Sequence, residues 1–172
     1  MVEKIKYKVV KKMDKVEIRR YPRIIIARVD RYGDSGFNIL FRFISGHNKQ
    51  KRSVEMTAPV ISERIEMTAP VLSDTNSIAF VMPEEYTLDT TPTPLDDRVK
   101  IGEIPERFLA VLRFSGRWSD SIFKARSEEL MKELAKAKMK TKGNVFVMRY
   151  SGPYMPWFLR RNEVAVEVEV NT

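Results

Sequence analysis

A hexapeptide that occurs twice in close succession constrains the fold of this chain more than any other feature. Glu55–Val60 reads Glu-Met-Thr-Ala-Pro-Val, and Glu66–Val71 repeats it. In each copy Met, Ala and Val fall on alternate positions, so they share one face of an extended strand. A segment with a polar centre separates the copies, so we expect a β-hairpin with its methionines inward and its glutamates in solvent. Proline lacks an amide hydrogen, which places Pro59 and Pro70 at edges, bulges or strand ends.

The rest of the chain predicts an α+β fold. Residues 35–45 and a segment from Ser119 or Asp120 to about residue 141 carry apolar residues at helical spacing. Gly46 and Gly143 are placed to end these helices. The Thr/Pro-rich residues 87–97 predict an extended linker between two halves. Strands are expected at residues 5–10, 15–21, 24–29, 77–82, 144–150 and 164–170.

A pattern of Val, Ile, Pro, Ala and Gly recurs 83 residues later in the chain. We interpret it as an internal duplication that relates halves of about 1–86 and 95–172 by a pseudo-two-fold axis. At 172 residues, the chain is expected to form one domain. The first copy comprises Val16, Ile18, Pro22, Ala27 and Gly33, and the second comprises Val99, Ile101, Pro105, Ala110 and Gly116.

Four motifs, in order along the chain, resemble the SOUL heme-binding protein family. They are Val16–Tyr21, the Met-Thr-Ala-Pro-Val string with the helix and Gly-x-Asn loop before it, Ile78–Pro83, and Arg160–Val164. The resemblance implies a distorted, mainly antiparallel β-barrel with two helices packed on it. It also implies noncatalytic binding of heme or another tetrapyrrole in an apolar cleft, with heme not required for folding.

The resemblance places Arg42 where a family heme binder carries a lysine thought to face the propionates. Arginine keeps the charge and can pair with a carboxylate through two hydrogen bonds. A second basic residue of that site falls on Asp34, so the chain departs from the family there.

Heme binding also requires an apolar slot that keeps water from the macrocycle. We expect this slot between the first helix, at Phe41, and the aromatic loop that contains Met155, Trp157 and Phe158. For each of these residues the alternative is packing in the core, which we favour for Phe41. Bulky apolar residues in a loop more often mark a binding site or an anchor.

No axial ligand is clear from the sequence. Some family members have a histidine where this chain has Arg20, and arginine is not a usual heme ligand. His47 lies in the loop after the first helix, where the alternative is a solvated histidine. Met56, Met67 and Tyr154 are further candidates.

Two other binding functions compete with heme binding. The first is an effector-type module for another amphipathic small molecule, in which a buried Glu163 would serve a cationic ligand. Pairing of Glu163 with Arg160 or Arg161 is the structural alternative. The second is a protein-interaction domain in which the basic loop His47–Arg52 docks an acidic partner.

Composition excludes several other classes. The chain has no cysteine and one histidine, and no serine lies in a Gly-x-Ser-x-Gly turn, so we expect no enzyme and no metal site. Despite the net charge of +8, no phosphate loop, zinc pattern or basic groove-binding helix predicts nucleic-acid binding. No apolar run is long enough to span a membrane, and Met1–Lys12 is not a signal peptide. We expect a soluble cytoplasmic monomer that contacts no membrane.

Overall fold

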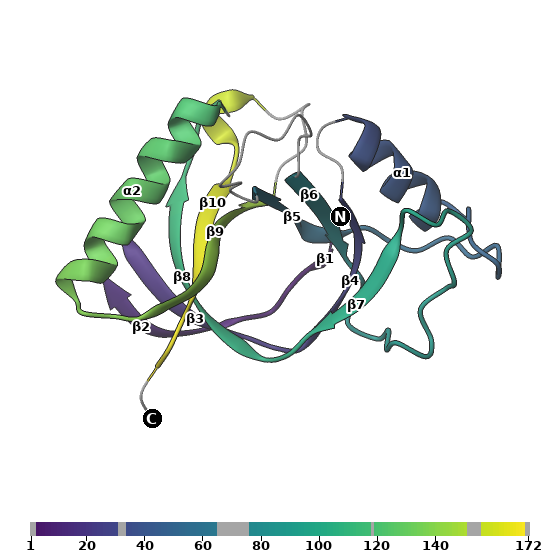
Figure 1. Cartoon of the computed structure of the whole chain (residues 1–172), viewed down its shortest axis with the longest axis horizontal. Coiled ribbons are helices and arrows are strands. Elements are labelled where there is room, and N and C mark those ends of the chain that lie inside the picture. The colour runs from purple at the N-terminus through teal and green to yellow at the C-terminus, as the bar shows by residue number, and fades with distance from the viewer. Residues whose placement is uncertain (1–2, 31–33, 65–75, 118, 151–155, 171–172) are drawn as a thin grey trace, which may run out of the picture. The chain divides into compact units, whose positions relative to one another are not determined.

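The computed structural model of the chain describes residues 3–30, 34–64, 76–117, 119–150 and 156–170 (Figure 1). The chain divides into two compact units. Unit 1 comprises Met1–Ile5 and Arg23–Pro105, and unit 2 comprises Lys6–Pro22 and Glu106–Thr172. Each unit therefore contains segments that are far apart in the sequence. The Thr/Pro-rich residues 87–97 lie within unit 1.

Unit 1 is a four-stranded antiparallel sheet with one helix. Its strand order is β5-β6-β4-β7, and the short strand β1 pairs in parallel with β5. The helix α1 packs on β4 and β6. The elements are β1 (Glu3–Lys4), β4 (Ile24–Val29), α1 (Asp34–Ile44), β5 (Thr57–Arg64), β6 (Asn76–Val81) and β7 (Lys100–Ile104).

Helix α1 forms because its apolar residues recur at helical spacing and meet one face of the sheet. Leu40, Phe43 and Ile44 are buried against a core that the β-branched residues of β4 help to build. Gly46 follows the helix with φ +117°, a backbone conformation that glycine adopts without steric cost. The helix end predicted at Gly46 is confirmed.

Unit 2 is a five-stranded antiparallel sheet with order β2-β3-β8-β10-β9. Figure 1 shows α2 lying along this sheet. The helix begins after Ser119, whose hydroxyl accepts a hydrogen bond of 3.2 Å from the backbone N–H of Ile122. The elements are β2 (Lys8–Met13), β3 (Val16–Tyr21), β8 (Arg107–Phe114), α2 (Asp120–Lys136), β9 (Thr141–Arg149), the 3-10 helix η1 (Trp157–Leu159) and β10 (Asn162–Val168).

The two faces of the unit 2 sheet differ in chemistry. Val164, Val166 and Val168 of β10 pack with Leu130 and Leu134 of α2 in one apolar core. Side chains alternate along a strand, so the residues between these valines point to the opposite face. That opposite face carries the buried charged residues Arg19 of β3 and Glu163 of β10.

The α+β class, the mainly antiparallel sheet and the two helices are confirmed, whereas a closed barrel and a duplication stay predictions. The second helix ends at Lys136 and not near residue 141. Its predicted stop, Gly143, lies inside β9, and Lys138 takes the positive φ of 55° after the helix. The sequence prediction was wrong here because the apolar spacing ends with Leu134, and Ala137 is exposed.

The predicted tandem hairpin is correct only in part. Glu55 is exposed and Met56 packs against the unit 1 core, as expected, but Thr57 is buried. The pairing of β5 with β6 shifts register between Thr57 and Val60, so Pro59 lies at an irregularity as predicted. Residues 61–64 continue β5 instead of turning, because each pairs with a residue of β6. The second hexapeptide lies outside the described residues.

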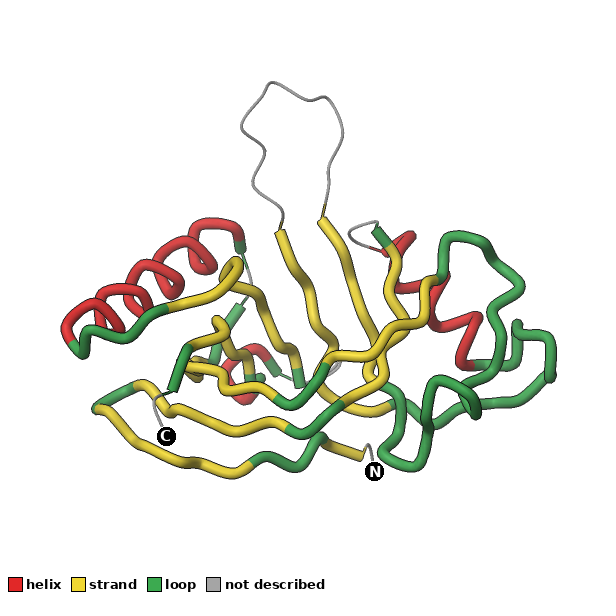
Figure 2. The backbone as a smooth tube through the Cα atoms, turned by 60° about the horizontal axis from the view of Figure 1, so that its bottom comes forward, coloured by secondary structure: helices red, strands yellow, loops and turns green. Residues whose placement is uncertain are grey.

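The side chain of Asn48 fixes the loop that follows α1, and the backbone of this loop pairs with a second loop of unit 1 at Asn48 and Pro94. Figure 2 shows loops of unit 1 side by side. The buried amide of Asn48 donates to the backbone oxygens of Phe43 at 3.0 Å and Arg52 at 2.8 Å. Its side-chain oxygen accepts from the N–H of Arg52 at 3.0 Å. The backbone N–H of Lys49 donates to the carbonyl of Thr93 at 2.9 Å, which joins this loop to the Thr/Pro segment. The asparagine of the motif thus has a structural role.

We predict that Asn48→Ala lowers the free energy of unfolding by about 2–3 kcal/mol, because it removes three hydrogen bonds around buried backbone groups. Urea denaturation measures the change. The matched control is Lys49→Ala, an exposed neighbour whose loss we expect to change stability by less than about 0.5 kcal/mol. Equal stabilities of the two variants would contradict the role of Asn48.

Candidate functional site

Two aromatic side chains stand exposed on the outer surface of α1. Phe37 and Phe41 are one helical turn apart, and their rings lie nearly parallel with centroids 6.1 Å apart. They are 36% and 49% exposed. Phe37 also contacts the ring of Phe80 edge-on at 5.2 Å, which anchors the pair to β6. The core packing that we favoured for Phe41 is therefore wrong, because α1 turns this residue away from its buried stripe.

Arg42 follows directly on the same helix and is exposed. Its charge helps to lower the pKa of Asp96, but the carboxylate of Asp96 is already paired with Arg98. Arg98 donates to the two oxygens of Asp96 at 2.9 and 2.6 Å, and these hydrogen bonds are the main cause that lowers the pKa of Asp96. The charge of Arg42 adds only a smaller effect. No ion pair of Arg42 is found in the described part of the chain, so its guanidinium can receive a ligand carboxylate.

The other predicted site residues are spread over both units. His47 is half-buried one turn beyond Arg42, and its backbone N–H donates to the carbonyl of Arg42 at 2.9 Å. In unit 2, Trp157 begins η1 and Phe158 is exposed, while Met155 lies outside the described residues. Phe41, Arg42 and His47 thus lie close together along the chain, in α1 and just after it. A slot shared with η1 stays a prediction.

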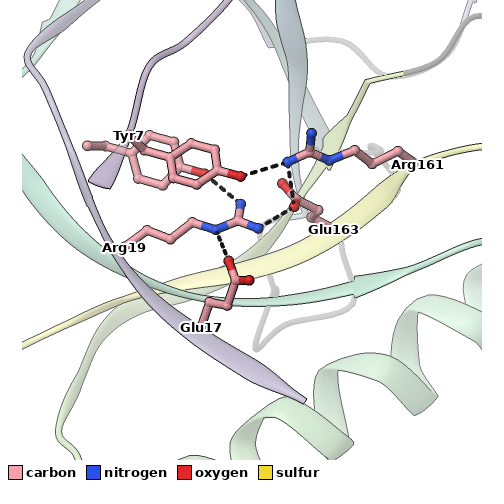
Figure 3. A network of polar contacts seen from close by, with 6 residues as sticks. Tyr7, Glu17, Arg19, Arg161 and Glu163 are labelled. Atoms are coloured by element: carbon pink, nitrogen blue, oxygen red, sulfur yellow. Dashed lines mark hydrogen bonds and ion pairs between the residues drawn. The ribbon is translucent and has the colours of Figure 1, made fainter. Parts of the chain in front are cut away.

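A buried cluster of charged and aromatic side chains lies in unit 2, on the sheet face opposite α2 (Figure 3). The carboxylate of Glu163 is fully buried, and its Oε2 accepts from Nη2 of Arg19 at 2.8 Å and Nη2 of Arg161 at 3.2 Å. Arg19 also donates to Glu17 at 2.9 Å and to the hydroxyl of Tyr21 at 3.0 Å. We call these five residues, together with Tyr7 and Tyr150, the arginine–glutamate cluster.

The rings of Tyr7 and Tyr150 cover the two guanidiniums. Arg19 lies over the Tyr7 ring at 4.1 Å, and Arg161 lies over the Tyr150 ring at 3.9 Å. Arg161 also donates to the Tyr7 hydroxyl at 3.0 Å. Cation–π contacts of this kind stabilise a guanidinium that has left water. The cluster is therefore a packed network in which charge and aromatic faces complement each other.

The cluster joins two of the motifs that the sequence analysis singled out. Glu17, Arg19 and Tyr21 come from Val16–Tyr21, whereas Arg161 and Glu163 come from Arg160–Val164. The predicted alternative of a Glu163–Arg161 pair is confirmed. Sequence reasoning missed Arg19 and the tyrosines. The available signal was the alternation of Glu, Arg and Tyr with Val and Ile along β3, which indicates one polar and one apolar face.

Burial and charge act together on the ionisable groups of the cluster. Burial alone lowers the pKa of Arg19 and Arg161, but the hydrogen bonds and charge of Glu163 help to outweigh it and raise both above the ordinary value. Burial is the main cause that raises the pKa of Tyr21 and Tyr150, and the negative charge of Glu163 adds to it. Both arginines are charged and both tyrosines are neutral at physiological pH.

This arrangement offers little reactive chemistry. Glu163 already contacts two cations, and only its Oε1 has no partner among the described residues. The described residues contain no cluster of His, Asp or Glu suited to a metal ion. Neither described helix is long and apolar enough to cross a membrane.

Comparison with known proteins identifies the family. A model of the family described as "SOUL heme-binding protein" matches residues 2–167, which include parts of both units. The chain belongs to the SOUL family. No curated protein matches the sequence of this SOUL protein.

Several solved structures share the fold of this SOUL protein at low identity. A structure described as the EcmrR C-terminal domain has a TM-score of 0.60 at 12% identity, covering 95% of this chain and 98% of that one. An uncharacterized conserved protein from Listeria innocua has a TM-score of 0.61 at 14% identity, covering 90% and 92%. A protein from the same organism described as a hydrolase has a TM-score of 0.59 at 12% identity, covering 93% and 94%. At these identities the likeness concerns the fold alone.

We predict that Glu163→Gln lowers the free energy of unfolding by about 3–5 kcal/mol, because it leaves two buried guanidiniums without their shared countercharge. The matched control is Glu167→Gln on the same strand, whose half-buried side chain lies 3.9 Å from Arg107. We expect less than about 1 kcal/mol for that variant. Urea denaturation distinguishes them, and similar losses would contradict the role of the cluster.

A second prediction concerns alkaline pH. The pKa of Tyr21 and Tyr150 is raised in the folded protein, so both keep their protons where an unfolded tyrosine begins to lose them, near pH 10. Their contribution to stability is therefore complete below that pH and decreases as pH rises above it, by up to about 1.4 kcal/mol per pH unit for each tyrosine. Denaturation curves measured from pH 9 to 11 should show a smaller slope in the double variant Tyr21→Phe/Tyr150→Phe. An unchanged slope would refute the assignment.

Proposed function

We propose that this SOUL protein binds heme or another tetrapyrrole without catalysing a reaction, and that the exposed face of α1 forms part of the site. One observation carries the proposal: two nearly parallel aromatic rings, and an exposed cation with no ion pair among the described residues, lie close together on α1. A tetrapyrrole is a flat apolar ring that bears carboxylates at one edge. Phe37 and Phe41 suit the ring, and Arg42 suits a propionate.

Apolar contact supplies most of the binding energy in this proposal. Covering two exposed phenylalanines with a macrocycle removes a large apolar area from water, at about 25 cal/mol per Å². Arg42 adds a charge-assisted hydrogen bond that orients the ligand. The proposal keeps Met155, Trp157 and Phe158 as further binding residues, as the sequence predicts. His47 is close enough in sequence to act as an axial ligand, but the proposal does not require iron coordination.

We also propose that the whole chain is one SOUL domain built by duplication and closed as a distorted barrel. The strand order supports the duplication: β5-β6-β4-β7 of unit 1 corresponds, strand for strand, to β9-β10-β8-β3 of unit 2. In this correspondence Pro22 follows β3 and Pro105 follows β7, at the predicted offset. Unit 1 then contains β7 from the second half of the chain, and unit 2 contains β2 and β3 from the first half.

The competing functions have weaker support. The effector-type alternative gives Glu163 to a cationic ligand, but Arg19 and Arg161 already match its charge. Protein binding by the loop His47–Arg52 is less favoured because all six of its residues are polar, so the loop itself offers no apolar surface to a partner. We therefore place tetrapyrrole binding first and take the protein to be a cytoplasmic monomer.

Titration with hemin, followed by the Soret band, tests the proposal. We expect saturable binding that Arg42→Ala weakens about tenfold, the effect of losing one charge-assisted hydrogen bond. Phe41→Ala should weaken it by a similar factor, because a ring contact is lost. Free protoporphyrin should bind as well.

Two variants in unit 1 serve as matched controls. Arg28→Ala removes an exposed arginine that pairs with Asp30, and Leu88→Ala removes a side chain that is as exposed as Phe41. Neither should change the affinity more than twofold. Absence of saturable hemin binding, or equal losses in the site and control variants, would contradict the proposal. Loss of the Soret shift in His47→Ala alone would replace it with axial ligation from the loop.

A further inference from the structure

The first long strand of the chain lies at an edge of the unit 2 sheet. β2 is the terminal strand in the order β2-β3-β8-β10-β9, and its only pairing partner among the described residues is β3. An edge strand presents a row of unpaired backbone N–H and C=O groups, which makes it a template for another extended segment. Figure 1 shows β2 as the outermost strand beside β3.

The side chains of β2 are exposed on both faces of this edge. Lys8 and Lys11 lie opposite Arg20 and Ile18, so they share the face that packs on α2, whereas Lys12 lies opposite Glu17 on the other face. None of these three lysines has an ion pair or hydrogen bond in the described part of the chain, and all are exposed. The edge therefore carries free positive charge above and below the plane of the sheet.

Two valines interrupt the lysines. Val9 and Val10 are 44% and 43% exposed, although they lie in the middle of β2. The register with β3 shifts between Val9 and Lys11, so Val10 is an irregular position that turns its side chain outward. Lysine–valine–valine–lysine–lysine thus offers apolar contact flanked by cations.

We propose that β2 binds an extended acidic segment of a partner protein by strand addition, with glutamate or aspartate opposite the lysines and small apolar residues opposite the valines. Main-chain hydrogen bonds would supply the contact and the alternating side chains the specificity. An added strand has side chains on both faces, so it can pair with Lys8, Lys11 and Lys12 at the same time. A flat lipid surface would meet only one face.

The same charges exclude two other occupants. Two copies of β2 placed edge to edge would set lysines near lysines, which is destabilising. An uncharged strand would form no ion pairs with the lysines, and it would partly remove their charges from water, which is unfavourable. Edge lysines usually protect a sheet against aggregation, and here that repulsion leaves an acidic strand as the favoured partner.

A synthetic peptide with the sequence Val-Glu-Glu-Val-Glu-Val-Glu, whose glutamates 2, 3 and 5 fall opposite Lys12, Lys11 and Lys8 when it runs antiparallel to β2, tests the proposal with the full chain; it is blocked at both ends and fluorescently labelled. We expect saturable binding by fluorescence anisotropy and slower exchange of the amide hydrogens of residues 8–12. The triple variant Lys8→Gln/Lys11→Gln/Lys12→Gln should weaken binding about tenfold, from the loss of three cross-strand pairs. The control Lys124→Gln/Lys132→Gln/Lys140→Gln removes the same charge from exposed lysines of α2 and the segment after it, and should weaken binding less than threefold.

Peptide chemistry separates strand addition from diffuse attraction. A peptide with all its amides N-methylated, or one of the same composition with its four glutamates before its three valines, should bind at least tenfold more weakly. The proposal is overturned if these peptides bind equally well or if the two lysine triples lose the same affinity. It is also overturned if no peptide binds while phosphatidylserine vesicles do.

Discussion

The buried carboxylate of Glu163 is the interaction on which the organisation of unit 2 depends. It accepts hydrogen bonds from Arg19, near the start of the chain, and from Arg161, near its end. Taking three charges out of water is costly, and only a nearly complete set of partners makes it tolerable. Tyrosine rings over both guanidiniums and the hydroxyl of Tyr21 provide that set. The motifs Val16–Tyr21 and Arg160–Val164 therefore depend on each other, because each supplies charges that the other neutralises.

This arrangement has consequences for folding and for the location of function. Unit 2 combines residues 6–22 with residues 106–172, so its core and its charge cluster require contacts between distant parts of the chain. Such contacts slow folding, because the chain loses loop-closure entropy before the contacts form and stabilise it. The cluster uses its charges internally. We therefore propose the outer face of α1 for ligand binding, where Arg42 has no ion pair among the described residues.

Sequence reasoning predicted the elements whose periodicity is set locally. The strand Ile24–Val29 and the helix Asp34–Ile44 agree closely with expectation, because β-branched runs and helical apolar spacing act over a few residues. It failed where a partner distant in the sequence determines the length of a strand or the contacts of a side chain. Residues 61–64 extend β5 because β6 pairs with them, and Arg19 finds Glu163 across the intervening strand β8.

The same distinction between local patterns and long-range packing applies to the candidate site. The position of Arg42 on α1 follows from the helical pattern and the family motif, but the exposure of Phe41 depends on how α1 meets β4 and β6. The buried role of Asn48 was likewise hidden, since a loop asparagine is ordinarily solvated and only the fold supplies its three backbone partners. Single-sequence patterns thus indicated the candidate elements, and packing decided which of their side chains are exposed.

The most direct test of the central claim is chemical-shift mapping of the isotope-labelled protein during titration with zinc protoporphyrin, a diamagnetic tetrapyrrole. A bound macrocycle produces ring-current shifts in the protons that it covers. The account predicts that the largest shifts occur at Phe37, Phe41 and Arg42, with small shifts at Arg19 and Glu163. Large shifts confined to β3 and β10, with α1 unchanged, would contradict it and place the ligand at the buried carboxylate.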